Sequence, residues 1–373
     1  MPEAIHQFVE LIHRAPGRVV LVVSGGGSGA IGSLLTVPGA SRTVLEVEVP
    51  YCQRAMVDYL GGRPDQFCSI ATSRALAVRA LHRAHDQAES DDATVAGIAC
   101  TAGLKTDRPR RGGHRAHVAM QTDERTVSYS LTLVKDRRDR HAEEQIVERM
   151  ILNTVAEARG LADRLGLDLD RDEPVERAET IAPPAWQDVL LGRRDVACVR
   201  GHDEQAHAVF SGAFNPMHIG HRRMTALARE ILGERVHFEI SLVNVDKPPM
   251  DYTEIEGRLA QFDPDQPVWL SHAATFEEKS QLFPGATFVV GIDTLRRIAD
   301  PRYYGQDVEA RNNAIERIAG RGCQFLVFGR DMGTGFMRLG DLDLPETLAK
   351  ICREVPSDHF REDISSTELR RRG

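Results

Sequence analysis

The chain has 373 residues, of which 42% are hydrophobic and 27% are charged, and its formal net charge is −8. This length predicts two domains with ordinary apolar cores, and the acidic balance excludes a general nucleic-acid-binding protein, which usually presents a basic face. The six cysteines are scattered without a C-x-x-C pair, so we expect neither a zinc site nor a disulfide framework. Because the sequence has no apolar stretch of 18 residues and no apolar leader, we expect a cytoplasmic protein without a membrane partner.

The first region of the chain has the pattern of an α/β domain. Apolar residues at helical spacing over 5–12 predict an opening helix, and the apolar run 18–23 predicts a buried strand. A turn with the sequence SGGGSGAIG follows at 24–32. Its G-x-G-x-x-G spacing over 27–32 is that of a dinucleotide-binding fingerprint, which is a weak signal by itself. A dehydrogenase that binds NAD(H) through residues 1–160 is therefore one open interpretation.

The same turn matches a second pattern. Residues 24–28 resemble the S-C-T-G-G loop in the C-terminal domain of the competence-damage-inducible CinA family, the nicotinamide-nucleotide amidohydrolases. The motif VPGAS at 37–41, then Tyr51, then GIA at 97–99 follow in that family's order. The resemblance extends over about residues 5–160 and implies a CinA C-terminal-like α/β domain.

The resemblance also implies an amidase site, with Ser24 as the nucleophile and Tyr51 beside it. The family's lysine, five residues after the tyrosine, is Met56 here, and its G-I-A-G-P-x-G-G loop becomes GIACTAG at 97–103. A serine hydroxyl is a weak nucleophile unless a neighbouring base takes its proton, and methionine is not a base. We therefore expect a degenerate site, and a bifunctional amidohydrolase and adenylyltransferase stays open as an alternative.

We place the first domain at 1–165, a linker at 166–204 and the second domain at 205–373. The apolar face of a helix ends near Gly160, and the segment after it is polar. The sequence DRDEP at 170–174 and two consecutive prolines further on interrupt regular structure in this segment.

The second half holds the most informative stretch of the chain, SGAFNPMHIGH at 211–221. It follows the apolar run 208–210 and opens an amphipathic segment with apolar residues at helical spacing over 224–232. The pattern predicts a strand, a turn and a helix that begins with His218 and His221. Unpaired backbone N–H groups and the positive end of the helix dipole suit a phosphate at such a helix start. The sequence therefore predicts a site for nucleotide phosphates.

A second motif, ISSTELRRR at 364–372, sharpens this interpretation. Together the two segments resemble the nucleotidyltransferase superfamily with HxGH and ISSTxxR motifs, and within it the nicotinamide or nicotinate mononucleotide adenylyltransferases. Intervening pieces agree in order: NVDKPP at 244–249, FVVGIDTL at 288–295 and LVFGR at 326–330. The resemblance implies a Rossmann-like α/β domain with a parallel sheet over 205–373.

The resemblance further implies adenylyl transfer from ATP to nicotinamide or nicotinate mononucleotide, with release of pyrophosphate, in NAD biosynthesis. His218 and His221 would be the catalytic residues, which stabilise charge on the phosphates. Mg²⁺ would accompany ATP, and no protein-bound metal is expected. We expect ATP and a mononucleotide as partners, a homo-oligomer, and no nucleic acid. The implied nucleotide-binding residues are Ser211, Gly212, Phe214, Asn215, Lys247, Gly291, Asp293, Arg330, Ser365, Ser366, Thr367 and Arg370.

Several alternatives stay open. The acceptor could be another phosphorylated molecule, such as phosphopantetheine, and the nucleotide could be CTP, because both motifs read phosphates. The chain could also be a non-catalytic nucleotide-binding protein. Ser365 and Glu368 fit a simple capping box, and Asp293 could cap a helix. The sequence does not choose between nicotinamide and nicotinic acid.

Overall fold

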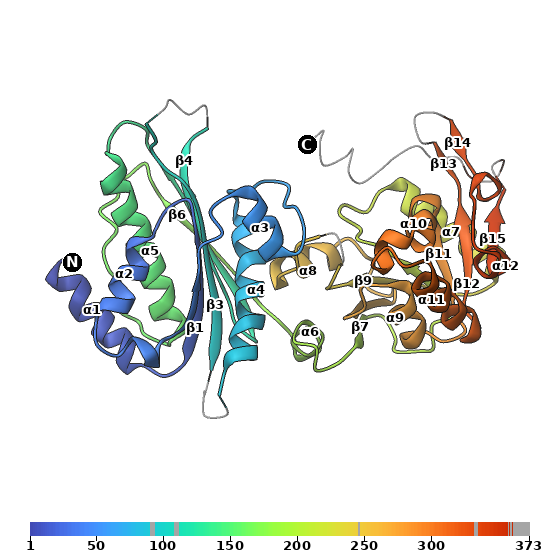
Figure 1. Ribbon diagram of the computed structural model, residues 1–373, viewed down its shortest axis with the longest axis horizontal. Coiled ribbons are helices and arrows are strands. Elements are labelled where there is room, and N and C mark those ends of the chain that lie inside the picture. The colour runs from blue at the N-terminus through green and yellow to red at the C-terminus, as the bar shows by residue number, and fades with distance from the viewer. Residues whose placement is uncertain are drawn as a thin grey trace. The chain divides into compact units, whose positions relative to one another are not determined.

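A computed structural model describes residues 1–89, 94–107, 112–244, 247–331, 335–356, 358 and 360. The chain divides into two compact units (Figure 1). The first comprises Met1–Gln187 and Asp246–Ile255, and the second comprises Asp188–Val245 and Glu256–Gly373. Each unit is a sheet with helices on both faces, which confirms the predicted α/β class.

The first unit is built on a six-stranded sheet in the order β2-β1-β3-β4-β5-β6. Strands β1 to β3 are parallel and the others are antiparallel to their neighbours. The strands are β1 (Arg18–Ser24), β2 (Val44–Glu48), β3 (Val95–Gly103), β4 (His114–Gln121), β5 (Arg125–Leu133) and β6 (Val175–Ile181).

Helices cover both faces of this sheet, which explains why the β1 residues form an uninterrupted apolar run rather than an alternating one. Helices α1, α2 and α5 lie on one face, and α3 and α4 lie on the other (Figure 1). Their bounds are α1 (Glu3–Arg14), α2 (Gly29–Thr36), α3 (Gln53–Leu60), α4 (Ile70–Gln87) and α5 (Arg140–Ala158).

The second unit has a seven-stranded sheet in the order β15-β12-β11-β8-β9-β10-β7, which is parallel except for β7. The strands are β7 (Val196–Arg200), β8 (Ala208–Ser211), β9 (Val236–Ser241), β10 (Val268–Ser271), β11 (Thr287–Gly291), β12 (Gln324–Phe328) and β15 (Cys352–Val355). The chain runs outward from β8 through β9 to β10, then returns to β11 beside β8 and continues the other way. The sheet therefore has a topological switch point between β8 and β11.

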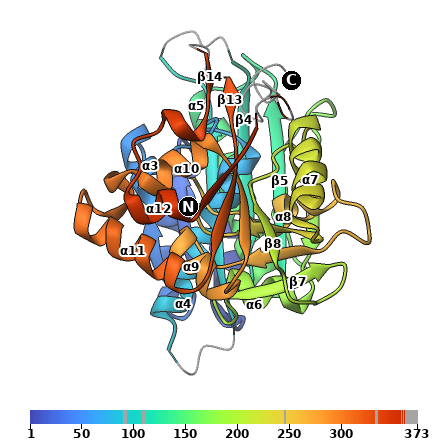
Figure 2. The ribbon, with the colours of Figure 1, turned by 90° about the vertical axis from the view of Figure 1, so that its right-hand side faces the viewer.

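Helices also cover both faces of the second sheet, with α7 on one side and α9 to α12 on the other (Figure 2). The apolar side chains of α10 and α11 pack with those of β8, β11 and β12 in one core. The helices are α6 (Pro184–Leu190), α7 (Ile219–Leu232), α8 (Tyr252–Leu259), α9 (Phe276–Leu282), α10 (Ile292–Ala299), α11 (Val308–Gly320) and α12 (Glu346–Lys350). Strands β13 (Arg330–Asp331) and β14 (Phe336–Met337) pair in a short antiparallel ribbon.

The segment 166–204, which the sequence predicts as a linker, is divided between the two units. Strand β6 pairs with β5 in the first sheet, and β7 pairs with β10 in the second. Five of the seven β6 residues are exposed, four of them in succession, which explains the polar appearance of this segment at the edge of the sheet. A helix that crosses a membrane needs about 20 mostly apolar residues, and none of the helices in the described ranges meets that requirement.

The segment Asp246–Ile255 packs within the first unit. Asp251 is 1% exposed, and its carboxylate accepts a hydrogen bond from the Arg74 guanidinium at 3.0 Å. The same carboxylate accepts the backbone N–H of Thr253 at 2.8 Å, so it also caps the start of α8. Tyr252 is fully buried, and its hydroxyl donates to the backbone carbonyl of Asp123 at 2.6 Å.

Candidate functional site

The predicted site residues of the second unit follow the carboxyl ends of three neighbouring strands. The loop 211–221 follows β8, Asp293 follows β11, and Arg330 follows β12. In open parallel sheets, ligands bind in the crevice outside the carboxyl ends of the strands at the switch point. The topology therefore brings these groups to one edge of the sheet, at the position that favours a ligand.

The buried ring of Phe214, here called the aromatic plug, shapes the first part of the loop 211–221. Phe214 has a left-handed backbone with φ of 44°, and its ring is buried edge-on against Phe210, Phe238 and Phe262 at 5.3 to 5.5 Å between centroids. A Cβ atom on Gly212 would lie 2.7 Å from the Phe214 ring. Because Gly212 has no side chain, the Phe214 ring can lie directly against the loop backbone. Of the predicted nucleotide contacts, the Phe214 side chain belongs to the core instead.

The two histidines stand at the start of α7 with their rings stacked. The ring centroids are 3.7 Å apart and the planes differ by 23°. The backbone N–H of His218 donates to Nδ1 of His221 at 3.2 Å. Since Nδ1 accepts this bond, the neutral His221 ring carries its proton on Nε2. Burial, helped by the neighbouring His218, lowers the pKa of His221 to about 3, so the imidazole is neutral at pH 7. It can therefore donate one hydrogen bond, from Nε2.

Three of the buried side-chain polar atoms that lack a hydrogen-bond partner among the described residues belong to this edge of the sheet. They are Oγ of Ser211, Nδ1 of His218 and Nε of Arg330. Most buried polar atoms in folded proteins are paired, so this group of three at one sheet edge favours a site that binds a polar ligand. The pKa of His218 is lowered by burial and, secondly, by the positive charge of Arg330. This interaction places His218 and Arg330 in the same electrostatic environment.

Arg330 is held by Asp293. Its Nη1 donates to the Asp293 carboxylate at 2.8 Å, and the two side chains are 30% and 35% exposed. The residue that caps α10 is Gly291 and makes no side-chain cap, so Asp293 serves as an ion-pair partner rather than as the cap that the sequence allowed. A guanidinium that is anchored on one side keeps its remaining donors for a phosphate or carboxylate.

Sequence reasoning missed Gln261. Its side-chain amide accepts the backbone N–H of Met217 at 2.7 Å and donates to the carbonyl of Phe214 at 2.9 Å. Arg258, which lies one turn earlier, donates to the carbonyl of Ala213 at 2.9 Å. These contacts hold the loop before His218, and no local pattern around a glutamine two residues after a helix indicates them.

The other predicted contacts are placed elsewhere or lie outside the described residues. Asn215 lies in the loop and is half-buried. Lys247 is exposed and belongs to the segment that packs within the first unit. The tail residues fall outside the described ranges: Ser365, Ser366, Thr367 and Arg370.

Among the residues that the structure describes, the implied amidase serine of the first unit makes no hydrogen bond to a basic side chain. Ser24 is buried, and its hydroxyl donates to the backbone carbonyl of Pro50 at 3.1 Å. A backbone carbonyl does not take a proton at neutral pH, so this contact does not activate the oxygen. Tyr51 is 72% exposed, and Met56 is buried in the core under α4.

The glycine-rich turn of the first unit is occupied by the protein itself. The Ser28 backbone N–H and hydroxyl both donate to the Glu144 carboxylate, at 2.7 and 2.9 Å. A Cβ atom on Gly27 would lie 2.3 Å from Ile151 and 2.9 Å from Val147, which shows that this glycine lets α5 pack closely. A pyrophosphate at this turn would face a carboxylate. The geometry therefore argues against the dinucleotide-binding interpretation.

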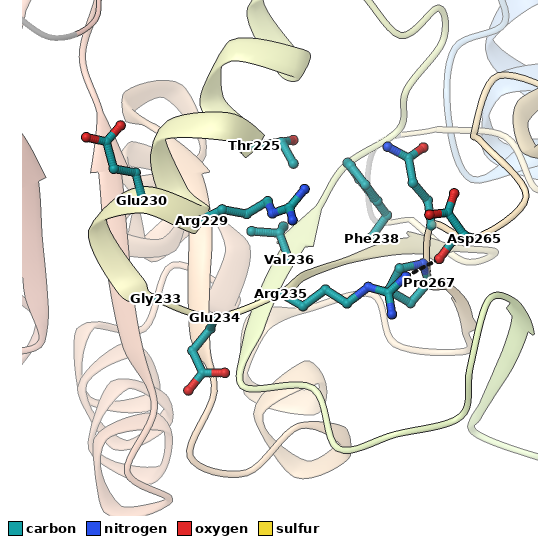
Figure 3. Close-up of a pocket in the computed structure, with 11 residues that line it drawn as sticks. Thr225, Arg229, Glu230, Gly233, Glu234, Arg235, Val236, Phe238, Asp265 and Pro267 are labelled. Carbon is teal, nitrogen blue, oxygen red and sulfur yellow. Dashed lines mark hydrogen bonds between the residues drawn. The ribbon is translucent and has the colours of Figure 1, made fainter.

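A cavity of about 610 Å³ opens at the far end of α7 (Figure 3). Arg229, Gly233 and Val236 line it, and Arg235 donates to the carbonyl of Asp265 at its edge. Thr225 in the wall of this cavity lies one turn of α7 after His221 and donates to the His221 backbone carbonyl at 2.8 Å, but the lining includes none of the predicted phosphate-binding residues that the structure describes. Both signs of charge line it, and it is not the predicted phosphate site.

Comparison with known proteins gives different matches for the two halves of the chain. Residues 209–372 match the family model described as cytidylyltransferase-like. The C-terminal domain is cytidylyltransferase-like. No curated protein matches the chain. The cytidylyltransferase-like domain includes the histidine loop, Asp293 and Arg330.

Solved structures are similar over the N-terminal portion. The competence/damage inducible protein CihA from Agrobacterium tumefaciens is 19% identical, with a TM-score of 0.34, over 42% of this chain and 97% of that chain. A CinA superfamily protein from Escherichia coli is 15% identical, with a TM-score of 0.30, over 41% of this chain and 90% of that one.

Proposed function

We propose that this protein transfers an adenylyl group from ATP to nicotinamide or nicotinate mononucleotide and releases pyrophosphate. One observation carries the proposal: a neutral, Nε2-protonated His221 stacks on His218 at the start of α7, at the switch point of a cytidylyltransferase-like domain. This arrangement supplies a fixed donor and a helix N-terminus for phosphate oxygens. The resemblance of the HxGH and ISSTxxR segments to mononucleotide adenylyltransferases supports the choice of substrates.

In the proposed reaction an oxygen of the acceptor's 5′-phosphate attacks the α-phosphorus of ATP. The bond from this phosphorus to the oxygen that bridges to the β-phosphate breaks, and pyrophosphate leaves. The attacking phosphate is already anionic, so the step requires neither a general base nor a covalent intermediate. Catalysis then consists of alignment and stabilisation of charge on the transferred group.

The described residues divide this work. His221 Nε2 and the first N–H groups of α7 would donate to the oxygens of the transferred phosphoryl. His218 Nδ1 and Arg330 Nε, which lack partners among the described residues, would gain them from the bound substrates. Arg330 would hold its phosphate with a fixed orientation, because Asp293 anchors it. Arg370 and the hydroxyls of Ser365, Ser366 and Thr367 would hold the β- and γ-phosphates, and Mg²⁺ would arrive with ATP and screen its charge.

The choice of nucleotide and acceptor is tested with the purified full-length chain. MgATP or MgCTP is combined with nicotinamide mononucleotide, nicotinate mononucleotide or phosphopantetheine, and pyrophosphate release is measured. We expect release with MgATP and at least one of the two pyridine mononucleotides. Release only with CTP or only with phosphopantetheine would replace the proposed substrates, while nucleotide binding without release in every combination would make the chain a non-catalytic binding protein.

A further inference from the structure

We infer that Gln261 is a positioning residue, whose side-chain amide clamps the loop that presents the two histidines. The inference rests on the proposed function for its kinetic consequence and on the geometry of the second unit for everything else. It assigns a role in the transfer reaction to a residue outside the HxGH segment.

The clamp consists of the two ends of one amide. Oε1 of Gln261 accepts the backbone N–H of Met217 at 2.7 Å, and Nε2 donates to the backbone carbonyl of Phe214 at 2.9 Å. The two bonds bracket Asn215 and Pro216, so they fix the width of the turn between the aromatic plug and the first histidine. One side chain thereby replaces the ladder bonds that a loop of this kind lacks.

A second side chain holds the same loop from the same direction. Arg258 is 8% exposed, and its Nη1 donates to the backbone carbonyl of Ala213 at 2.9 Å. Arg258 lies in the last turn of α8, and Gln261 is the second residue after the helix. The end of α8 therefore contacts the loop backbone at Ala213, Phe214 and Met217. A helix end is a rigid support, and function requires such support when two rings must keep a fixed position.

Hydrogen bonds and the backbone between Met217 and His218 connect the Gln261 clamp to the imidazole of His221. Met217, whose N–H Gln261 accepts, is directly followed by His218. The N–H of His218 in turn donates to Nδ1 of His221 and so places the imidazole proton on Nε2. If Met217 moves, the bond that fixes the His221 tautomer and ring position moves with it. Displacements of about 1 Å in reacting groups cost roughly 10²-fold in rate.

The test compares Gln261→Met, which keeps length and loses both hydrogen bonds, with Gln261→Glu, whose carboxylate keeps only the acceptor. Gln324→Ala is the control, because Gln324 is exposed at the amino end of β12. We expect Gln261→Met to lower kcat for pyrophosphate release roughly 10- to 100-fold with a much smaller change in the KM for ATP. The control should retain wild-type turnover.

Gln261→Glu adds a readout that depends on the clamp itself. When the introduced carboxyl is protonated, its O–H can again donate to the Phe214 carbonyl while its other oxygen accepts from Met217. The kcat of this variant, relative to wild type, should therefore rise as the pH is lowered from 8 towards 5. A ratio of the Gln261→Glu kcat to the wild-type kcat that does not change with pH would overturn the clamp. This pH measurement tests the clamp by itself if Gln261→Met does not fold.

The clamp and the transferase proposal fail in different ways. If the wild-type chain is active but Gln261→Met keeps its turnover within twofold, the clamp is overturned and the transferase proposal stands. If no acceptor yields pyrophosphate, the transferase proposal fails, and histidine NMR titration of the wild type and Gln261→Met still decides the clamp. Loss of the clamp should raise the pKa of His221 from its low value, because a loosened loop admits water, and an unchanged pKa would contradict it.

Discussion

Two loops of this molecule have the same local pattern and different surroundings. The turn 24–28 follows β1, the loop 211–218 follows β8, and each connects a parallel strand to a helix. In the first loop, Glu144 and the carbonyl of Pro50 take up the polar groups of Ser28 and Ser24. The second loop leaves buried polar atoms without partners among the described residues. A glycine-containing turn after a strand therefore indicates a ligand only when its polar groups are left for one.

The charged groups near the two loops differ as well. Two carboxylates of α5, Glu144 and Glu148, accept hydrogen bonds from Ser28 and Ser33 beside the first loop. Near the second loop lie the guanidinium groups of Arg258 and Arg330, the latter paired with Asp293, and the histidines are neutral because burial lowers their pKa values. Arg140 also reaches the first loop, where it donates to the Gly25 carbonyl, but it is paired with Glu144. The second loop therefore has the more favourable charges for an anionic ligand. The comparison predicts that variants in the second loop abolish function and that variants in the first do not.

The largest effect is expected from His221→Ala. This change removes the Nε2 donor from the transferred phosphoryl, and loss of one such donor lowers turnover by roughly 10²–10³-fold. The measurement is kcat for pyrophosphate release, with His202→Ala as the control because His202 is exposed. A higher KM with unchanged kcat would mean that His221 binds the ground state and has no special role in the transition state.

A smaller effect is expected from Arg330→Met. Charge-assisted hydrogen bonds contribute about 1.5–3 kcal/mol, so the KM for ATP should rise roughly 10- to 100-fold. Arg353→Met serves as the control, since Arg353 is exposed on β15. If Asp293→Asn, which releases Arg330 from its ion pair, produces no change while Arg330→Met does, then the anchoring of the guanidinium is unimportant.

The pH dependence of stability should distinguish the buried imidazole of the second loop. The pKa of His221 is about 3 in the folded protein and 6.5 in an unfolded chain. Between these values the unfolded state binds more protons, so the free energy of unfolding falls as the pH is lowered below 6.5. The fall is at most about 1.4 kcal/mol per pH unit for this group, and it ceases below pH 3.

Urea unfolding of the wild type and His221→Gln at pH 7 and pH 5 measures this contribution. The wild type should lose more stability than the variant over this interval, because only the wild type has the buried imidazole. Equal losses would show that His221 is solvated and protonates normally.

The smallest effects are expected in the first loop. Ser24→Ala and Glu144→Gln should each leave pyrophosphate release within about twofold of wild type, because substitutions away from a functional group change little. The full-length wild type should also release no ammonia from nicotinamide mononucleotide. Ammonia release that disappears on Ser24→Ala would erase the contrast between the two loops and restore a working amidohydrolase.

The sequence was sufficient where the signal is local. Strand, turn and helix around His218 are consecutive in the chain, and the strand ends before Asp293 and Arg330 are readable from their apolar runs. Contacts between distant segments could not be predicted. The Glu144 carboxylate that fills the first loop lies 116 residues from Ser28, and the Gln261 amide lies 44 residues from Met217.

Side-chain direction was equally hidden in the sequence. Phe214 lies in the segment 211–221, which ends with the HxGH motif, yet its ring is buried in the core. The positive φ at this residue turns the side chain inward. The association of Asp246–Ile255 with the first unit depends on Asp251 and Tyr252 meeting partners far earlier in the chain. Such pairings are decided by tertiary packing, which periodicity and spacing do not encode.

Product analysis tests the central claim most directly. The full-length protein is incubated with MgATP and either pyridine mononucleotide, and the dinucleotide and pyrophosphate are quantified together. Adenylyl transfer predicts the two products in equal amounts from the wild type and neither above background from His221→Ala. Pyrophosphate without dinucleotide, or equal product from both proteins, would contradict a transferase centred on the histidine loop.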